Sequence, residues 1–548
     1  MNITYENRVY KVSPGTTIRS FLEQNGLMKP GILAVQSNGQ AWELTDALTF
    51  DCTLKPLTLC DEEGRRIYER SLRFVMLLAV RRLLPGQRVR IEYSAGQGVY
   101  VQLPGLKPDT TLFERIKIEM EHITAADLPF TKKIWALQDA IRYFREDGQQ
   151  DKVELLTLRP YDSFTMYCID GMWDYFYGIM APSTGSVKVF SIIPKERGFV
   201  LQLPVKEDPA NPAGYIERPK HLTVFEQSAH WCTILGIKNA ADLSALYRDS
   251  KFRQFIRVNE ALHDQAIGSI AHDIAQKGKR IIFVSGPSSS GKTTFAHRLD
   301  VHLRVLGFHP VIISLDNYYL DRDKIPLEPD GTIDLESIHT LDLPCFQQQM
   351  LDLLAGQTVA LPVFNFKTGK REEHGTPLTL EPGQPIIIEG IHGLNPQLSE
   401  SIGEDIKYRI FVSALTCLNL DDHNRIRTTD VRLLRRIVRD NQFRGTQPAA
   451  TLAMWPSVRA GEETWIFPYQ ENADVMFNTA LHYELPFLKK VAYDLLQAIP
   501  DSSDVYLPAR RLLKILHYIP EISHSLYDEV PPTSILREFI GGSGFDKD

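Results

Sequence analysis

A glycine-rich segment at residues 286–293 has the residue types and spacing of a phosphate-binding loop. Its sequence, G-P-S-S-S-G-K-T, fits the pattern G-x-x-x-x-G-K-[ST] in full. The glycines let backbone N–H groups turn inward around phosphate oxygens, and a helix that begins here adds partial positive charge. Lys292 is expected to reach the β- and γ-phosphates of ATP and Thr293 to bind Mg²⁺. The residues expected to bind ATP in this segment are Gly286, Ser288, Ser289, Ser290, Gly291, Lys292, Thr293 and Thr294.

Two acidic residues stand at the ends of later strand-like runs. Asp316 follows the apolar run 311–315, and Glu389 ends the run 385–389. Ligands collect at the carboxyl edge of a parallel sheet, so both side chains are expected beside the loop. Asp316 could take the proton from an attacking hydroxyl, and Glu389 could hold Mg²⁺ directly or through water. The structural alternatives are a helix cap for Asp316 and a strand-end turn for Glu389.

Four arginines between residues 431 and 440 follow a helical spacing. Arg432, Arg435, Arg436 and Arg439 occupy positions i, i+3, i+4 and i+7, which share one helix face. Like charges on one face repel unless an anion neutralises them, and guanidinium groups suit phosphoryl oxygens. The pattern predicts an arginine lid over ATP; the alternative is a solvated helix face with two aspartates nearby.

The elements that must position these groups alternate between short apolar strands and helices. Strand-like runs lie at 280–285, 311–315, 385–389 and 408–412, with helical stretches between them. Buried parallel strands alternating with helices predict a three-layer α/β domain. Residues 1–60 are typical of a small β-rich module, residues 153–203 are strand-rich, and residues 222–278 are helical.

Length and composition limit the number of domains, the type of ligand and the cellular compartment. A chain of 548 residues favours three to four domains, and its formal charge of −7 argues against bulk electrostatic binding to nucleic acid. The six cysteines are scattered with no C-x-x-C pair, which predicts neither a zinc ribbon nor a disulfide framework and favours a cytoplasmic location. We expect no signal peptide and no membrane contact, because no apolar run is long enough.

Residues 280–480 resemble the uridine kinase family of P-loop kinases, which is related to phosphoribulokinase. The resemblance is carried by the loop, D-N-Y-Y at 316–319, L-P-V-F-N-F at 361–366, K-R-E-E at 370–373, I-E-G-I at 388–391 and R-L-L-R-R-I-V-R-D at 432–440. It implies that ATP–Mg²⁺ phosphorylates the 5′-hydroxyl of a ribonucleoside. Asp316 falls on the family's general base and Glu389 on the acidic residue near the metal.

The resemblance also implies the remaining site residues. Lys292, Arg436 and Arg439 are expected to act in catalysis with Asp316. Arg435 and Arg444 belong to the lid and are expected to bind ATP. The expected acceptor-binding residues are Tyr318, Asp334, Glu336, Phe364 and Arg432, with Glu336 where the family has an aspartate that contacts the ribose hydroxyls.

The chain departs from the family where the family reads the base. Phe364 stands in place of a tyrosine, and the segment from Phe364 to Glu373 is about one residue short and holds no histidine. Phe364 can still stack on a base. Uridine and cytidine are the first acceptors to test, with a sugar phosphate as the alternative.

The N-terminal half has a different resemblance. Its short motifs are L-P-G at 84–86, I-E-M-E at 118–121 leading to D-L-P-F at 127–130, K-V-E-L-L at 152–156 and P-S-T-G at 182–185. Residues 1–60 are similar to a TGS domain of β-grasp type and, on these motifs, residues 61–221 resemble the α+β editing-type second domain of threonyl-tRNA synthetase. The metal-binding or hydrolytic histidines and cysteine of that domain fall on Arg70, Phe74, Phe176 and Met180, none of which is a plausible zinc ligand. The resemblance therefore implies a retained fold without the editing chemistry.

These inferences give one domain plan and two classes of function. The plan is a TGS-like domain (1–60), an editing-like domain (61–221), a helical connector (222–279), a P-loop kinase-like domain (280–500) and a C-terminal extension (501–548). The first function is a nucleoside kinase that uses ATP and Mg²⁺ and forms a homo-oligomer. The second is a non-enzymatic regulator that senses nucleotides or contacts RNA through the N-terminal half, for which the sequence gives no support beyond an aromatic run at 172–177.

Overall fold

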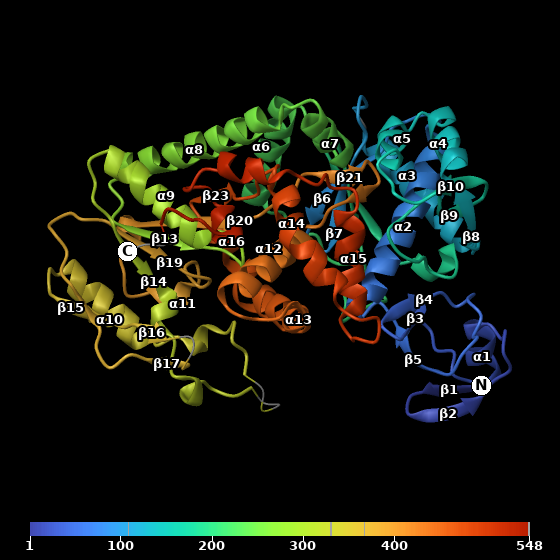
Figure 1. The fold of residues 1–548 in the computed structure, drawn as a ribbon, viewed down its shortest axis with the longest axis horizontal. Coiled ribbons are helices and arrows are strands. Elements are labelled where there is room, and N and C mark those ends of the chain that lie inside the picture. The colour runs from blue at the N-terminus through green and yellow to red at the C-terminus, as the bar shows by residue number, and fades with distance from the viewer. Residues whose placement is uncertain (108, 329–330, 332, 366–367, 546–548) are drawn as a thin grey trace.

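The computed structural model describes residues 1–107, 109–328, 331, 333–365 and 368–545, and Figure 1 shows their arrangement. Phe366, the last residue of the 361–366 motif, lies outside the described residues. The N-terminal part (residues 1–217) and the C-terminal part (residues 218–545) lie side by side along the long axis of the molecule.

The first 60 residues form a five-stranded mixed sheet with one helix packed on it. The strand order is β2-β1-β5-β3-β4, and β1 pairs with β5 in parallel while the other neighbours are antiparallel. Thr17 caps α1 (Ile18–Gln24) by accepting a hydrogen bond from the amide of Ser20. The strands are β1 (Asn2–Tyr5), β2 (Arg8–Lys11), β3 (Ala34–Ser37), β4 (Gln40–Trp42) and β5 (Cys52–Leu57).

Residues 62–202 form two antiparallel sheets around the long helix α2 (Glu62–Leu83). One sheet has the order β11-β12-β7-β6 and the other β10-β9-β8. The strands are β6 (Arg90–Ala95), β7 (Gly98–Gln102), β8 (Thr131–Ala136), β9 (Ser163–Ile169), β10 (Met172–Asp174), β11 (Ser191–Lys195) and β12 (Gly198–Gln202); the further helices are α3 (Thr110–Ala125), α4 (Leu137–Glu146) and α5 (Gln150–Leu156).

The four positions that correspond to the editing residues do meet in this part of the fold. The rings of Phe74 and Phe176 lie 5.2 Å apart between centroids, and both belong to the apolar core with Met180. The guanidinium of Arg70 donates a hydrogen bond to the carbonyl of Ile179. Apolar packing and one arginine therefore fill this position.

The C-terminal part is built on a five-stranded parallel sheet, as the apolar runs predict. Its order is β14-β19-β13-β20-β23, with every neighbouring pair parallel. The strands are β13 (Ile281–Ser285), β14 (Val311–Ser314), β19 (Ile386–Glu389), β20 (Lys407–Ser413) and β23 (Val475–Asn478). The last strand is not among the predicted runs.

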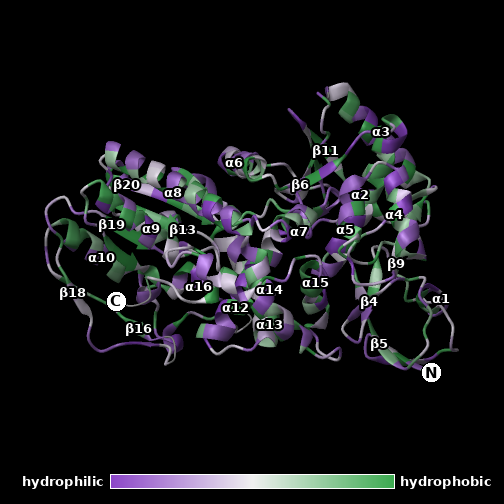
Figure 2. Cartoon of the chain, turned by 45° about the horizontal axis from the view of Figure 1, so that its top comes forward, coloured by the Kyte–Doolittle hydropathy of each residue, from purple (hydrophilic) through white to green (hydrophobic). Residues whose placement is uncertain are grey.

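Two cores cover the two faces of this sheet, because alternate side chains of a strand point to opposite faces. Ile282 and Val284 belong to the core formed with α8 (Phe252–Gln276) and α9 (Lys292–Val305), and Ile281 and Phe283 to the core formed with α10 (Leu343–Leu354). Figure 2 shows these apolar strands enclosed by helices whose hydrophilic and hydrophobic residues alternate.

The segment expected to be a connector, residues 222–279, is packed into the C-terminal part. It forms α6 (Pro219–Leu235), α7 (Ala240–Arg248) and α8, and residues of all three share one apolar core with α9. The segment 501–545 joins the same core through α15 (Tyr506–Leu516) and α16 (Arg537–Ile540), which lie near α14 (Glu484–Gln497) and α12 (Thr428–Phe443). Both segments bury apolar side chains, so neither is a free linker or tail.

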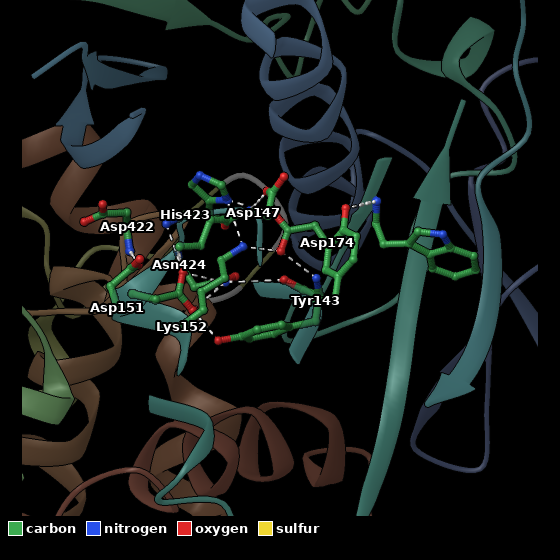
Figure 3. Close-up of polar contacts among 12 residues, drawn as sticks. Tyr143, Asp147, Asp151, Lys152, Asp174, Asp422, His423 and Asn424 are labelled. Atoms are coloured by element: carbon green, nitrogen blue, oxygen red, sulfur yellow. Dashed lines mark hydrogen bonds and ion pairs between the residues drawn. The ribbon is translucent and has the colours of Figure 1, made fainter. Parts of the chain in front are cut away.

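A buried polar network joins the N-terminal and C-terminal parts (Figure 3). The ammonium of Lys152, on α5, bonds to the carboxylate of Asp174 and lies 2.9 Å from Nδ1 of His423. His423 lies in the hairpin of β21 (Asn419–Asp421) and β22 (Asn424–Arg425), which immediately precedes α12. Tyr175 donates a hydrogen bond of 2.8 Å to Asp421. Because Lys152 and Asp174 are fully buried, each needs the other's charge.

No helix among the described residues is long and apolar enough to cross a membrane.

Candidate active site

The loop 286–293 runs from the end of the central strand β13 to the start of α9. A Cβ atom at position 286 would overlap the carbonyl oxygen of Val412 on the neighbouring strand, so only glycine fits there. Gly291 has a φ of +84° and Ser289 a φ of +59°, which turn the backbone back on itself. The strand–loop–helix context that the motif requires is therefore present.

Other parts of the chain hold the loop at Ser288. Its amide donates to Oε1 of Glu462 at 3.2 Å, and its carbonyl accepts from Nε and Nη2 of Arg432 at 3.0 and 2.9 Å. Arg436 donates a hydrogen bond of 2.9 Å to its hydroxyl. The buried hydroxyls of Ser289 and Ser290 have no hydrogen-bond partner among the described residues, so these groups are available to a ligand.

Lys292, Asp316 and Glu389 come together beside the loop. Burial lowers the pKa of Lys292, while Glu389 and Asp316 raise it. Burial raises the pKa of Asp316, and Lys292, Arg444 and Arg439 lower it. Burial and then Asp316 raise the pKa of Glu389 to about 7. Lys292 responds to both carboxylates and both carboxylates respond to Lys292, so the predicted base, the predicted metal ligand and the loop lysine share one site.

The two carboxylates fit a divalent cation. Glu389 is held by a hydrogen bond of 2.7 Å from the hydroxyl of Ser314, which orients its carboxylate. Asp316 and Glu389 each raise the cost of ionising the other, and a divalent cation would relieve this repulsion. Thr293 lies exposed in the first turn of α9 with its hydroxyl open to ligands. These oxygen atoms are of the type that Mg²⁺ prefers.

The acidic segment 334–336 lies against α13 (Pro448–Trp465). Trp465 donates a hydrogen bond of 2.8 Å to Asp334, whose other oxygen accepts from the amide of Glu336 at 3.0 Å. Burial and then Glu462 raise the pKa of Glu336 to about 7. A Cβ atom at position 461 would overlap Glu336, so Gly461 permits this close approach. Glu336 thus faces the same site as the loop.

The arginines of α12 do not form one open face over ATP, so the prediction of a four-arginine lid is wrong for two of them. Arg432 is buried and paired with Glu462, and Arg435 is buried and paired with Glu484 at 2.8 and 2.5 Å. Carboxylates of the chain itself neutralise them. Arg432 and Arg435 therefore support the loop backbone and do not face an acceptor or ATP directly.

The remaining arginines, Arg436, Arg439 and Arg444, lie near the loop and Asp316. Arg436 contacts Ser288, and Arg439 and Arg444 lower the pKa of Asp316. All three surround Asp440, with N–O distances of 3.3, 2.9 and 3.7 Å. The buried carboxylate of Asp440 therefore pairs with three cations near the loop, two on α12 and one directly after it.

Two aromatic residues differ in their fit to the expected acceptor site. Tyr318 is fully buried, with its ring against Phe346 and its hydroxyl donating to Gln349 at 2.7 Å, so it belongs to the core and not to the site. Its neighbour Tyr319 has its pKa raised by burial and then by Asp316, Glu336 and Glu389. Phe364 lies beside Tyr319, with the ring centroids 5.7 Å apart.

The C-terminal segment also reaches the loop, a contact that no pattern in the sequence predicts. Glu538 on α16 accepts hydrogen bonds from the amide and hydroxyl of Thr294 at 3.3 and 2.9 Å. Ile535 lies against Gly291. The hydroxyl of Thr294, predicted to bind ATP, is therefore engaged by Glu538. These glutamates are far from their partners along the chain: Glu462 is 174 residues from Ser288, Glu538 is 244 from Thr294, and Glu484 is 49 from Arg435. Only the fold therefore reveals these pairs.

Comparison with known proteins agrees with this arrangement. Residues 281–483 match the Phosphoribulokinase / Uridine kinase family. The uridine kinases of Deinococcus deserti and Lactobacillus johnsonii are each 28% identical over 36% of this chain, which covers 86% and 84% of their own lengths. The resemblance predicted for the C-terminal part is confirmed.

The N-terminal half is similar to a different group. The threonine–tRNA ligase of Symbiobacterium thermophilum is 31% identical over 191 residues, which is 34% of this chain and 29% of the ligase. The chain thus spans less than a third of the ligases it matches. The resemblance predicted for the N-terminal half is confirmed at the level of sequence similarity.

Proposed function

We propose that this protein is an ATP-dependent kinase that transfers the γ-phosphoryl group to the 5′-hydroxyl of a ribonucleoside, with uridine or cytidine as the first candidates. The observation that carries the proposal is the convergence of Lys292, Asp316 and Glu389 at the carboxyl edge of the parallel sheet, where both carboxylates raise the pKa of Lys292 and Lys292 lowers the pKa of both.

The residues divide the work of phosphoryl transfer. Asp316 accepts the proton of the acceptor hydroxyl, and its raised pKa improves it as a base near neutral pH. Lys292, Arg436 and Arg439 offset charge on the transferring group. When bound, Mg²⁺ supplies positive charge to the phosphate oxygens, and Thr293 and Glu389 would hold it.

The acceptor would lie between Asp316 and the segment 334–336. Glu336 is placed to accept hydrogen bonds from ribose hydroxyls, and Phe364 offers a ring for the base. Because Phe364 supplies no polar contact from its ring, stacking dominates over reading of the base edge. We therefore expect a broader choice among bases than among sugars, with deoxyribose and sugar phosphates as poor acceptors.

A panel of acceptors tests the proposal. ADP release from ATP and Mg²⁺ is measured with uridine, cytidine, adenosine, 2′-deoxyuridine and ribulose 5-phosphate, each against a reaction without acceptor. Turnover that depends on a ribonucleoside and falls by about 10² or more in Lys292→Ala and Asp316→Ala is the expected result. Turnover only with the sugar phosphate, or none with any acceptor, contradicts the proposal.

A further inference from the structure

An open cavity of about 560 Å³ lies where α15 meets the N-terminal part, distinct from the phosphate loop. One wall is formed by residues 159–179, from the part of the fold around β9 and β10, and the other by α14 and α15. Figures 1 and 2 show α15 between α14 and the N-terminal part. The cavity is within the size range of small-ligand sites.

The cavity has a strongly one-sided charge. Of the described residues that line it, Arg159, Arg510, Lys514 and His517 are basic and none is acidic. Among the described residues, the side chains of Lys514 and Arg510 form no hydrogen bond or ion pair, and the guanidinium of Arg510 lies 5.6 Å from the centre of the Tyr506 ring. Glu63 raises the pKa of Lys514. Lys514 is open to solvent, but the partial loss of its water shell inside the cavity, and then Arg70, Arg510 and Arg159, lower its pKa. Crowded cations of this kind are relieved by a bound anion.

Aromatic side chains complete the walls. Tyr161, Tyr177, Phe164 and Tyr518 line the cavity, and Tyr161 is half exposed. Arg159 is fixed among them, because it donates a hydrogen bond of 2.6 Å to Tyr518 and its guanidinium lies 4.3 Å from the centre of the Phe164 ring. Flat rings beside fixed cations suit a ligand that is both aromatic and anionic.

We propose that this cavity is a second binding site, for a free nucleotide whose base stacks on the tyrosines while its phosphate meets Arg510 and Lys514. Of the three permanent cations, Arg510 and Lys514 come from α15, which lies outside residues 281–483 and outside the N-terminal part, whereas Arg159 comes from the N-terminal part. The site therefore exists only where the two parts of the chain meet. The proposal does not depend on which acceptor the kinase uses.

Calorimetric titration of the full chain with AMP and UMP tests the site. The experiment is carried out in the Lys292→Ala background, which weakens binding at the loop, and compares the double variant Arg510→Gln/Lys514→Gln with Lys55→Gln, an exposed lysine on β5. We expect the double variant to weaken nucleotide binding at least tenfold and Lys55→Gln to leave it unchanged, since each lost cation removes a charge-assisted hydrogen bond. Both cavity positions are exposed, so the variants are expected to fold.

Further ligands separate charge from stacking. Ribose 5-phosphate and adenosine each lack one half of the ligand, and both are expected to bind at least tenfold more weakly than AMP. Photolabelling with 8-azido-AMP is expected to mark peptides within 159–179 or 506–518. Equal binding by the double variant, equal binding of ribose 5-phosphate, labelling confined to other peptides, or no nucleotide binding below about 1 mM would each overturn the proposal.

Discussion

The raised pKa of Glu389 makes the proposed kinase sensitive to pH in the neutral range. Burial and Asp316 raise this pKa from 4.5 to about 7, while Lys292 and the hydroxyl of Ser314 lower it. The carboxyl must be ionised to hold Mg²⁺, so the function is present above this pKa and is lost as the pH falls through it.

The size of the effect follows from the titration. With a pKa of about 7, the ionised fraction of Glu389 falls from about 90% at about pH 8 to about 10% at about pH 6, whereas with a pKa of 4.5 it would stay above about 95%. We therefore expect kcat/KM for ATP–Mg²⁺ to fall about ninefold between these pH values. The assay is ADP release at saturating acceptor from about pH 5.5 to about pH 8.5.

The variant Ser314→Ala isolates the cause. Ser314 donates a hydrogen bond of 2.7 Å to Glu389, and its loss removes an interaction that favours the ionised form. A hydrogen bond to a charged group is worth about 1.5–3 kcal/mol, so the acid limb is expected to move up by about one to two pH units. A matched control is Ser269→Ala on the exposed surface of α8, which is expected to keep the wild-type profile. A flat wild-type profile down to about pH 6, or the same limb in Ser314→Ala, would refute the reasoning.

Three further predictions concern the supports of the site. Gly461→Ala is expected to raise KM for the acceptor about tenfold in the same assay, because the new Cβ overlaps Glu336. The control, Ala460→Ser on the exposed side of α13, is expected to have little effect. An unchanged KM in Gly461→Ala would contradict the proposal that Glu336 binds the acceptor. Lys152→Met is expected to destabilise the full chain by about 3–5 kcal/mol, seen as a lower melting temperature, because it leaves the buried carboxylate of Asp174 without its main partner. The control is Lys133→Met at an exposed position, and equal melting temperatures of the two variants would contradict a stabilising role of the Lys152–Asp174 pair. Arg432→Lys is expected to lower both the melting temperature and the affinity for ATP, because lysine cannot bond to Ser288 and Glu462 together. The control is Arg444→Lys at a half-exposed position, which is expected to change the melting temperature little. If Arg432→Lys is stable and keeps the wild-type KM for ATP, the ion pair of Arg432 with Glu462 does not hold the loop.

The sequence predicts the central sheet well because its strands are continuous apolar runs. Four of the five parallel strands are visible in this way, and β13, β19 and β20 are almost entirely buried. The strand β8 is not predictable, since its exposed residues Thr131–Ala136 form a strand only by pairing with β9 some 30 residues later. Long-range pairing there outweighs the local pattern.

The chemical groups of the site are predictable to the extent that a local motif carries them. Lys292 and Asp316 follow strands and Glu389 ends one, so the rule for parallel sheets places them together. The choice between Tyr318 and Tyr319 is beyond such a rule, because a short 3₁₀ turn at Leu315–Tyr318 decides which ring enters the core. The partners of the arginines are equally hidden, since the helical period shows which residues share a face but not which distant carboxylates lie against it.

The N-terminal half and the C-terminal segment, which lie outside the proposed kinase site, are joined by ion pairs to α12, the helix whose arginines are predicted to form a lid. Arg427, just before this helix, pairs with Glu69 of α2 at 2.5 Å, and Asp430 in its first turn lies 3.7 Å from Arg66 of α2 and 3.1 Å from Arg511 of α15. Asp430 is buried, so these cations are needed to keep it ionised at low cost. The helix that carries Arg436 and Arg439 therefore begins inside an interface made by the N-terminal half and the C-terminal segment. Since α15 presents Arg511 to this helix and Arg510 to the cavity, the lid and the proposed nucleotide site rest on the same element.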